Sequence, residues 1–253
     1  MARSFILSEA TLTETGSTDY QVAVLPWGAT EAHNYHLPYS TDNYQAVAIA
    51  EEAARLAQSK DSRVVVLPAI PFGANAQQLE IPMTINLNPS SQFVVLQDIV
   101  ASLETHGVER LVILNGHGGN DFRWMVRELQ ETTSVFMCVV DWYRFLDPGS
   151  YFDEPGDHAG EMETSLMMHL HPDLVKPLTQ AGSGAEKKFK IEALREGRAW
   201  APRHWPSVTD DTGVGNPSRA TAKKGETFFS ELTLQLSEFL VELASADLED
   251  LYQ

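Results

Sequence analysis

The chain has 253 residues, of which 43% are hydrophobic and 21% charged, and its formal net charge is −17 at pH 7. That length suits one α/β domain with a sizeable core, so we expect residues 1–253 to form a single domain. The acidic balance argues against nucleic acid and anionic membranes as partners, since phosphate groups are held mainly by Lys and Arg.

Four short apolar runs, rich in β-branched residues, predict buried strands. They cover residues 22–25, 63–67, 111–114 and 135–141. Apolar residues at helical spacing predict helices after or between these runs. The helices cover residues 42–57, 90–106, 122–130, 163–170 and 225–251. This alternation predicts right-handed crossovers and a mostly parallel central sheet with helices on both faces, which is a three-layer α/β/α fold.

The segments between these elements differ in composition. Residues 68–89 are rich in Pro, Gly and Asn and predict a long functional loop. Residues 185–200 fit either a strand or a short helix, and 204–217 are typical of a mobile loop or lid. No apolar run approaches the ~20 residues of a membrane helix, and the first residues lack the features of a signal peptide. We therefore expect a cytoplasmic protein.

The stretch from 28 to 42 combines acidic and imidazole side chains directly after the first strand. It carries Glu31, His33, His36 and Asp42. Carboxylate and imidazole groups are the ligands of divalent metals, and Glu31 and His33 share one face of an extended backbone. Asp42 lies where the next helix starts, so it could instead cap that helix. We favour the ligand role because of the neighbouring Glu31 and His33.

Two further runs bring the same residue types to other loops. The run 111–120 ends a strand and offers His117. The run 156–165 follows the fourth strand and carries Asp157, His158, Glu161 and Glu163. Ligands of parallel sheets bind beyond the carboxyl ends of the strands, where all three loops are expected to lie. The sequence therefore predicts one metal site assembled from three loops.

These runs also resemble the creatininase (creatinine amidohydrolase) family. The shared patterns are E-x-H-x-x-H-L-P-x-x-T-D, N-G-H-G-G-N, H-A-G-x-x-E-T-S and a C-terminal G-x-P-x-x-A-T-x-x-x-G, which together span about residues 25–226. The resemblance implies a metal-dependent amidohydrolase and a homo-oligomer, often a hexamer. It supplies four ligands, Glu31, His33, Asp42 and His117, with Asp42 as the bridge between two ions.

The second pattern departs from creatininase itself, which resembles N-G-H-Y-E-N there and binds metal through its Glu. Gly119 stands at that place in this chain. We predict that Glu163 replaces the missing carboxylate, with Glu161 as the second choice. Gly118 and Gly119 predict a tight strand-to-helix turn whose backbone N–H groups can bind a substrate oxygen.

The remaining polar and aromatic residues near these loops are candidates for catalysis and substrate binding. His158 is the expected general acid, delivering a proton to a departing nitrogen, although it could also be a structural histidine. Asp157 and Glu161 are further catalytic candidates from the same run. The expected substrate-binding residues are His36, Gly118, Gly119, Trp142 and Tyr143. The single cysteine, Cys138, lies in an apolar run and predicts a buried, inert thiol.

We therefore expect a metal-dependent amidohydrolase that cleaves a non-peptide C–N bond of a small cyclic amide or formamide by a metal-activated water. The expected cofactor is a pair of divalent ions, Zn, Mn or Fe, which mixed carboxylate and imidazole ligands all accept. The alternatives are a metal-dependent lyase or isomerase, and a non-catalytic metal- or ligand-binding protein of the same fold.

Overall fold

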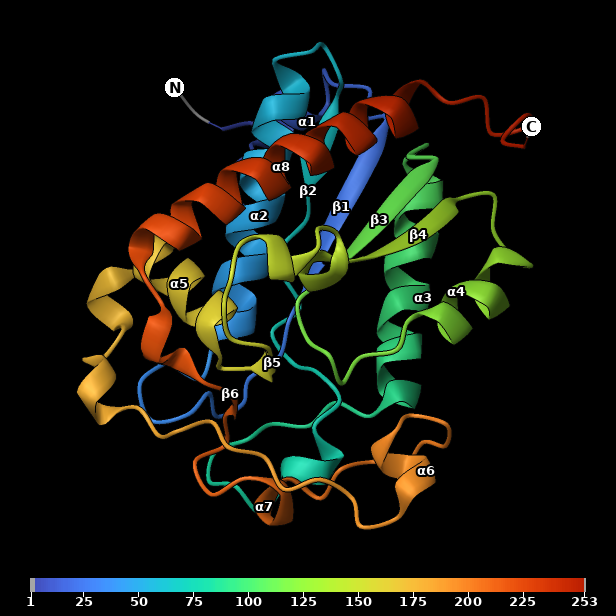
Figure 1. The fold of residues 1–253 in the computed structure, drawn as a ribbon. Coiled ribbons are helices and arrows are strands. Elements are labelled where there is room, and N and C mark those ends of the chain that lie inside the picture. Colours follow the sequence, from blue (N-terminus) through green and yellow to red (C-terminus); the bar gives the residue numbers. More distant parts are fainter. Residues whose placement is uncertain (1–2, 253) are drawn as a thin grey trace.

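A parallel four-stranded sheet forms the centre of the computed structural model, which describes residues 3–252 (Figure 1). Its strands are β1 (Val22–Trp27), β2 (Val64–Val66), β3 (Arg110–Asn115) and β4 (Phe136–Asp141), in the order β2-β1-β3-β4. β1 and β3 lie inside the sheet, and every residue of β1 is buried. Continuous apolar runs suit this position because both faces of an inner parallel strand are covered.

Helices cover both faces of the sheet, which confirms the three-layer fold. Val22 and Val24 point to the face covered by α2 (Thr41–Gln58) and α8 (Ala222–Ser245). Ala23 and Leu25 point to the opposite face, covered by α3 (Pro89–Thr105) and α4 (Arg123–Gln130). α5 (Glu161–Leu170) packs against α8 and α2 on the first side. Figure 1 shows α2, α5 and α8 on one side of the strands and α3 and α4 on the other.

Shorter elements lie outside the central sheet, most of them beyond the end where the parallel strands finish (Figure 1). β5 (Gly156–His158) and β6 (Val214–Gly215) form a separate antiparallel pair. α6 (Glu192–Arg195) and α7 (Trp205–Val208) lie in the long segment between α5 and α8, and α1 (Leu12–Thr15) precedes the sheet. Among residues 3–252, no helix combines the length and apolar character that a membrane span requires.

The structure corrects several boundaries. Ser40 is the N-cap residue of α2, so Asp42 lies in the first turn and does not cap the helix. α8 ends at Ser245 rather than near 251, and the Asp247 side chain then accepts the N–H of Glu249, a local bond that competes with helix continuation. The ambiguous segment 185–200 contains the short helix α6. The expected mobile loop at 204–217 instead holds α7 and β6, where Trp205 is buried.

An ion pair between a buried carboxylate and a partly exposed lysine joins the start of α5 to the first turn of α8. The Glu161 side chain is fully buried and pairs with Lys224 of α8. It also accepts the backbone N–H groups of Asp153 and Glu154, at 2.8 and 2.7 Å. A buried carboxylate is tolerated only where its charge and lone pairs are matched in this way. The pair therefore fixes the position from which α5 begins.

Replacing Lys224 by Met should destabilise the fold because it leaves the Glu161 carboxylate buried without its counter-charge. We expect a loss of about 2 kcal/mol in the free energy of unfolding, less than for a fully buried pair because Lys224 is partly exposed. Urea unfolding measures this loss. Lys223→Met is the matched control, since within residues 3–252 Lys223 pairs with Glu226 alone, at the surface, and its unfolding curve should not move. Equal curves for both variants would contradict the structural role of Glu161.

Candidate metal centre

Asp42 lies at the centre of a cluster of buried ionisable side chains beyond the ends of β1 and β3. One carboxylate oxygen, Oδ1, is 2.9 Å from His33 Nε2, and the other, Oδ2, is 3.2 Å from His117 Nδ1. Glu31 Oε1 is also 2.9 Å from His117 Nδ1. Glu163 Oε1 lies 3.9 Å from His33 Nε2. The two oxygens of Asp42 thus face different partners, one on each side.

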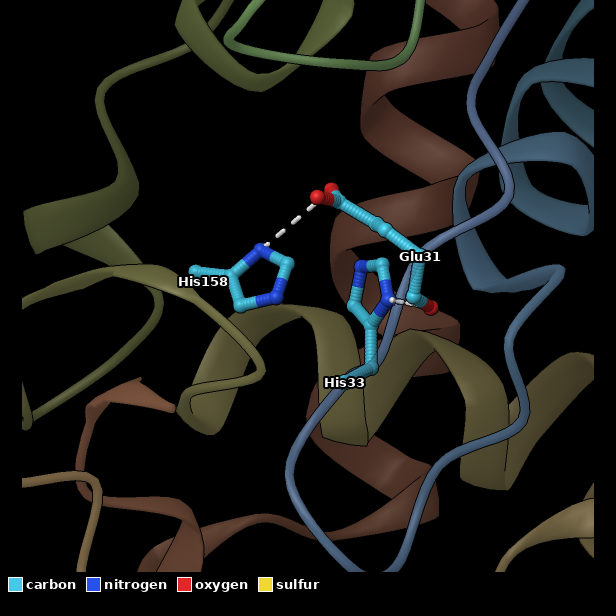
Figure 2. A group of neighbouring side chains, drawn as sticks. All are labelled: Glu31, His33 and His158. Carbon is cyan, nitrogen blue, oxygen red and sulfur yellow. Dashed lines mark hydrogen bonds and ion pairs between the residues drawn. The ribbon is translucent and has the colours of Figure 1, made fainter. Parts of the chain in front are cut away.

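These side chains form two groups of three that share Asp42. Glu31, Asp42 and His117 make the first group, and His33, Asp42 and Glu163 make the second; within each group the ligand atoms lie within 4.8 Å of one another. A third group joins Glu31, His33 and His158 (Figure 2), in which His158 Nδ1 is 3.7 Å from Glu31 Oε1. The arrangement brings together all five ligands expected from the sequence, and adds His158.

Each of the three histidines has one ring nitrogen against a backbone carbonyl oxygen. His33 Nδ1 faces the carbonyl of Glu31 at 3.2 Å, and His117 Nε2 faces that of Ala74 at 3.3 Å. His158 Nε2 faces the carbonyl of Ala32 at 2.8 Å. A carbonyl oxygen only accepts, so these nitrogens carry the proton and donate it. The opposite nitrogen of each ring faces the carboxylates. Once that nitrogen loses its proton, its lone pair is directed into the cluster, which is how metal-binding histidines are usually oriented.

The unpaired atoms of the cluster fit a divalent cation. With neutral imidazoles protonated on the nitrogens that face the carbonyls, Glu31 Oε1, His33 Nε2 and Asp42 Oδ2 are buried and make no hydrogen bond within residues 3–252. Buried polar atoms normally have a partner, because leaving them unpaired is costly. Three buried carboxylates also carry more negative charge than three neutral imidazoles can compensate. Oxygen and imidazole donors of this kind suit Zn, Mn or Fe.

The pKa values of the cluster show that the carboxylates favour positive charge on their neighbours. Burial would lower the pKa of His33, but the Asp42 and Glu163 carboxylates raise it to about 10. Burial also opposes protonation of His117, yet Glu31 and Asp42 hold its pKa well above the usual value. The pKa of Asp42 is lowered despite its burial by the adjacent His33 and His117. Without a metal, protons on the imidazoles therefore neutralise the carboxylates, and a bound cation would replace those protons.

A network of side-chain amides shapes the turn that carries His117. Asn115 Oδ1 accepts the backbone N–H of His117 and an amide N–H of Asn120, both at 3.1 Å. Asn120 Oδ1 in turn accepts the backbone N–H of Ala74 at 3.0 Å and an amide N–H of Gln92 at 2.8 Å. These bonds hold the turn after β3 against the loop 68–89. His117 is thereby fixed beside Asp42.

Gly119 has no room for a side chain. A Cβ at this position would lie 2.5 Å from the carbonyl oxygen of Ala74 and closer still to the His117 ring. At Gly118, by contrast, the nearest atom to an added Cβ is the Tyr143 hydroxyl at 4.0 Å. The expected tight turn is therefore observed, and its steric requirement falls on Gly119. A carboxylate ligand at 119 is incompatible with this packing.

Glu163 reaches the cluster from the first turn of α5. Its Oε2 accepts the backbone N–H of Ala159, which leaves Oε1 facing His33. Ala159 is fully buried and has a φ of 51°, a left-handed conformation that is uncommon for a residue with a side chain. This strained turn aims the N–H at Glu163, and strain of this kind is often found at functional sites.

Several residues expected at the site lie elsewhere. Glu161 faces Lys224 and not the cluster, so the structure does not support it as a ligand or catalytic residue. Trp142 is fully buried in the core against Phe228, because it directly follows β4 and packs under α8. His36 is buried and bonds Thr164 Oγ1 at 2.8 Å, while burial lowers its pKa to about 4. It therefore supports α5 rather than forming an active-site wall.

A cavity of about 1070 Å³ opens beside the cluster. Its lining includes Glu31, Asp42, His117, His158 and Glu163, together with the predicted substrate-binding residues Gly118, Gly119 and Tyr143. Asp157 lines it at an exposed position, paired with Arg203 at 3.0 Å. Trp205 stands edge-on to the His158 ring, with centroids 5.3 Å apart. The loop 68–89 also lines the cavity, through Ala74, Gln78 and Asn86.

The sequence reasoning missed Gln78, Arg203 and the amide pair of Asn115 and Asn120. The amides were visible as the two ends of the N-G-H-G-G-N pattern, and their spacing around three glycines could have indicated a buttressed turn. Gln78 carries no local signal beyond its place in a Pro- and Gly-rich loop.

Comparison with known proteins supports one family for nearly the whole chain. A sequence model of the family described as "Creatininase: Creatinine amidohydrolase" matches residues 8–240. The mycofactocin precursor peptide peptidase of Mycobacterium tuberculosis is 30% identical, over 89% of this chain and 86% of that protein. The creatinine amidohydrolase of Pseudomonas putida is 30% identical over 61% of this chain and 66% of that protein.

Solved structures agree with this assignment. A Bacteroides fragilis protein, described as a candidate creatinine amidohydrolase, is 44% identical with a TM-score of 0.93 and full coverage of both chains. A zinc form and a manganese form of creatininase share the fold, at 24% and 23% identity and TM-scores of 0.78 and 0.75, each over 96% of this chain and 99% of theirs.

Gly119→Ala should damage the cluster because its Cβ would push the His117 ring away from the carbonyl of Ala74. We expect the affinity for Mn or Zn to fall by about ten-fold or more, as when a support of a metal-binding histidine is lost. Calorimetric titration of chelator-treated protein measures this affinity. Gly118→Ala is the matched control, and its metal affinity should equal that of the wild type. Wild-type affinity in Gly119→Ala would show that the packing at this turn does not hold His117.

Proposed function

Because this chain belongs to the creatininase family of amidohydrolases, we propose that it hydrolyses the C–N bond of a small cyclic amide or formamide at a centre of two divalent ions. The observation that carries this proposal is the division of the Asp42 carboxylate between two ligand groups. A carboxylate can bridge two ions through its two oxygens, whereas an imidazole cannot. Zn, Mn and Fe all remain suitable ions.

The residues that would hold the two ions follow from the two groups. Glu31, Asp42 and His117 would hold the first ion, and His33, Asp42 and Glu163 the second. When bound, such ions polarise a carbonyl and lower the pKa of a water molecule. Glu163 thereby replaces the carboxylate that Gly119 cannot carry. His158 lies next to both groups. Its Nδ1 faces Glu31 of the first group, and its ring centroid is 4.1 Å from that of His33 in the second group.

His158 is the residue best placed to transfer the proton that hydrolysis requires. Its Nε2–H is engaged by the carbonyl of Ala32, so Nδ1 faces Glu31 with a lone pair. A neutral His158 therefore accepts a proton before it can donate one. It takes the proton from the attacking water as the C–O bond forms, and it delivers that proton to the nitrogen as the C–N bond breaks. The expected role as general acid thus follows a first role as general base.

Tyr143 and the glycine turn are suited to position the amide. The Tyr143 hydroxyl oxygen accepts from Asn115 Nδ2 at 3.4 Å, and within residues 3–252 its own proton has no acceptor. It can therefore donate that proton to a substrate oxygen in the cavity that it lines. Gly118 leaves open space next to this hydroxyl. Trp205, packed against His158, would exclude water from one side of the proton-transfer residue.

A second candidate is a peptidase that acts on a short peptide. The cavity volume of about 1070 Å³ favours it, because pockets for drug-sized ligands are about 300–1,000 Å³ and a small cyclic amide would fill only part of this one. The Mycobacterium tuberculosis relative is a peptide peptidase.

The homo-oligomeric assembly that the family resemblance implies stays a prediction.

The two-ion proposal is tested by counting metals in two variants. Asp42→Asn should lose both ions, because the bridge is weakened on both sides, whereas Glu163→Gln should weaken one ion and keep the other. Elemental analysis and Mn titration of purified protein measure the stoichiometry and the two affinities. Two ions bound in Asp42→Asn with wild-type affinity would rule out the bridge. Two wild-type affinities in Glu163→Gln would show that Glu163 is not a ligand.

The reaction is tested by a screen of amides with Mn- or Zn-loaded protein. Each class of substrate gives a different product. A formamide releases formate, a small lactam gives a ring-opened amino acid, and a short peptide gives a new free amino terminus. His158→Ala should retain both ions and lose about 10²–10⁴-fold in kcat. Tight metal binding without turnover of any of the three classes would instead support the non-catalytic alternative.

A further inference from the structure

Gln78 connects the cavity to the metal ligands. It ends the short helix Ala76–Gln78 within the loop 68–89, is 2% exposed and lines the cavity. Its amide nitrogen Nε2 donates to Glu31 Oε2. Glu31 Oε1, the other oxygen of that carboxylate, faces His117. Gln78 therefore holds the Glu31 carboxylate so that one defined oxygen is presented to the cluster.

The orientation of the Gln78 amide is fixed by this bond. The nitrogen and oxygen of an amide are often interchangeable in an assignment, but a carboxylate can only accept hydrogen bonds. The atom facing it must be the nitrogen. The carbonyl oxygen Oε1 of Gln78 therefore points away from Glu31.

That carbonyl oxygen has no donor. Gln78 Oε1 is buried, and among residues 3–252 no N–H or O–H group is within hydrogen-bonding distance and geometry. Buried acceptors are rarely left unpaired unless a ligand or water supplies the donor. The residue lines the cavity and directly contacts a metal ligand, so a donor there would belong to a molecule bound at the site. An amide substrate carries such a donor only if its nitrogen bears a hydrogen.

We propose that Gln78 is a specificity-determining residue whose Oε1 accepts the N–H of the substrate amide, so that the site selects primary amides, secondary amides and N–H lactams over tertiary amides. This inference rests on the proposed function. The selection arises because a tertiary amide leaves the Gln78 oxygen unpaired in a buried place, and sites built to hydrogen-bond a substrate group reject analogues that lack it. The steric effect of one N-methyl group is small in a cavity of about 1070 Å³.

The test compares 2-pyrrolidinone with N-methyl-2-pyrrolidinone, which share a lactam carbonyl and differ in the N–H. Calorimetry with Mn-loaded wild-type protein should show about ten-fold tighter binding of 2-pyrrolidinone. Gln78→Met removes the acceptor and the donor, and Gln78→Lys keeps a donor for Glu31 while removing the acceptor. Both variants should bind the two lactams with a ratio near one. Gln77→Met is the matched control from the same short helix, and its ratio should equal that of the wild type.

The affinity for Mn distinguishes the role of Gln78 Nε2, which supports Glu31, from that of Gln78 Oε1, which accepts from the substrate. Gln78→Met should bind Mn about ten-fold more weakly because Glu31 loses its support, while Gln78→Lys should stay near the wild-type affinity. Three outcomes would overturn the inference. The wild type could bind the two lactams with equal affinity, Gln78→Lys could keep a ten-fold preference for 2-pyrrolidinone, or neither lactam could bind the wild type. These outcomes are independent of the metal count and of product release. A wild type that holds two ions and hydrolyses amides while binding both lactams equally would refute only the role of Gln78.

Discussion

The constraint on which the site depends is the burial of three carboxylates within a few ångströms of one another. Glu31, Asp42 and Glu163 come from a loop and the first turns of two helices, and all are nearly inaccessible to water. Like charges in such surroundings repel strongly unless a cation lies between them. The N-terminal turn of α2 offers a partial positive charge to Asp42, but that effect is too small to offset three carboxylates. The arrangement is stable only with added positive charge, which protons or metal ions can supply.

Hydrogen bonds to the backbone orient most of the side chains in this cluster. The carbonyl oxygens of Glu31, Ala32 and Ala74 fix the three imidazole rings, and the N–H of Ala159 fixes Glu163. Side-chain amides serve the same purpose for the turn after β3. Because these supports are present in the protein alone, the candidate ligands are oriented without a bound ion. Preorganisation of this kind reduces the free energy that binding must supply.

The sequence predicted the parts of this structure that depend on patterns along the chain. The apolar run 111–114 gave β3, and the rule that ligands gather at strand ends placed Asp42 near His117. It ranked Glu163 above Glu161 as a ligand but kept Glu161 as a catalytic candidate. Residues two apart on a helix differ by about 200° in direction, and the pairing of Glu161 with Lys224, which turns it away from the cluster, leaves no local pattern. Trp142 was misplaced because an aromatic residue after a strand can face a cavity or the core. β5 and β6 were missed because three- and two-residue strands containing glycine carry no periodicity.

The two imidazoles nearest Asp42 present different nitrogens to it, Nε2 from His33 and Nδ1 from His117. The two ring nitrogens are chemically similar but lie at different distances from the main chain. An asparagine side chain ends about where Nδ1 lies, and a glutamine ends about where Nε2 lies. Asparagine at 117 would therefore keep a donor atom in place, whereas asparagine at 33 would fall short by about one bond length. The two histidines thus tolerate different replacements, although both serve the same carboxylate.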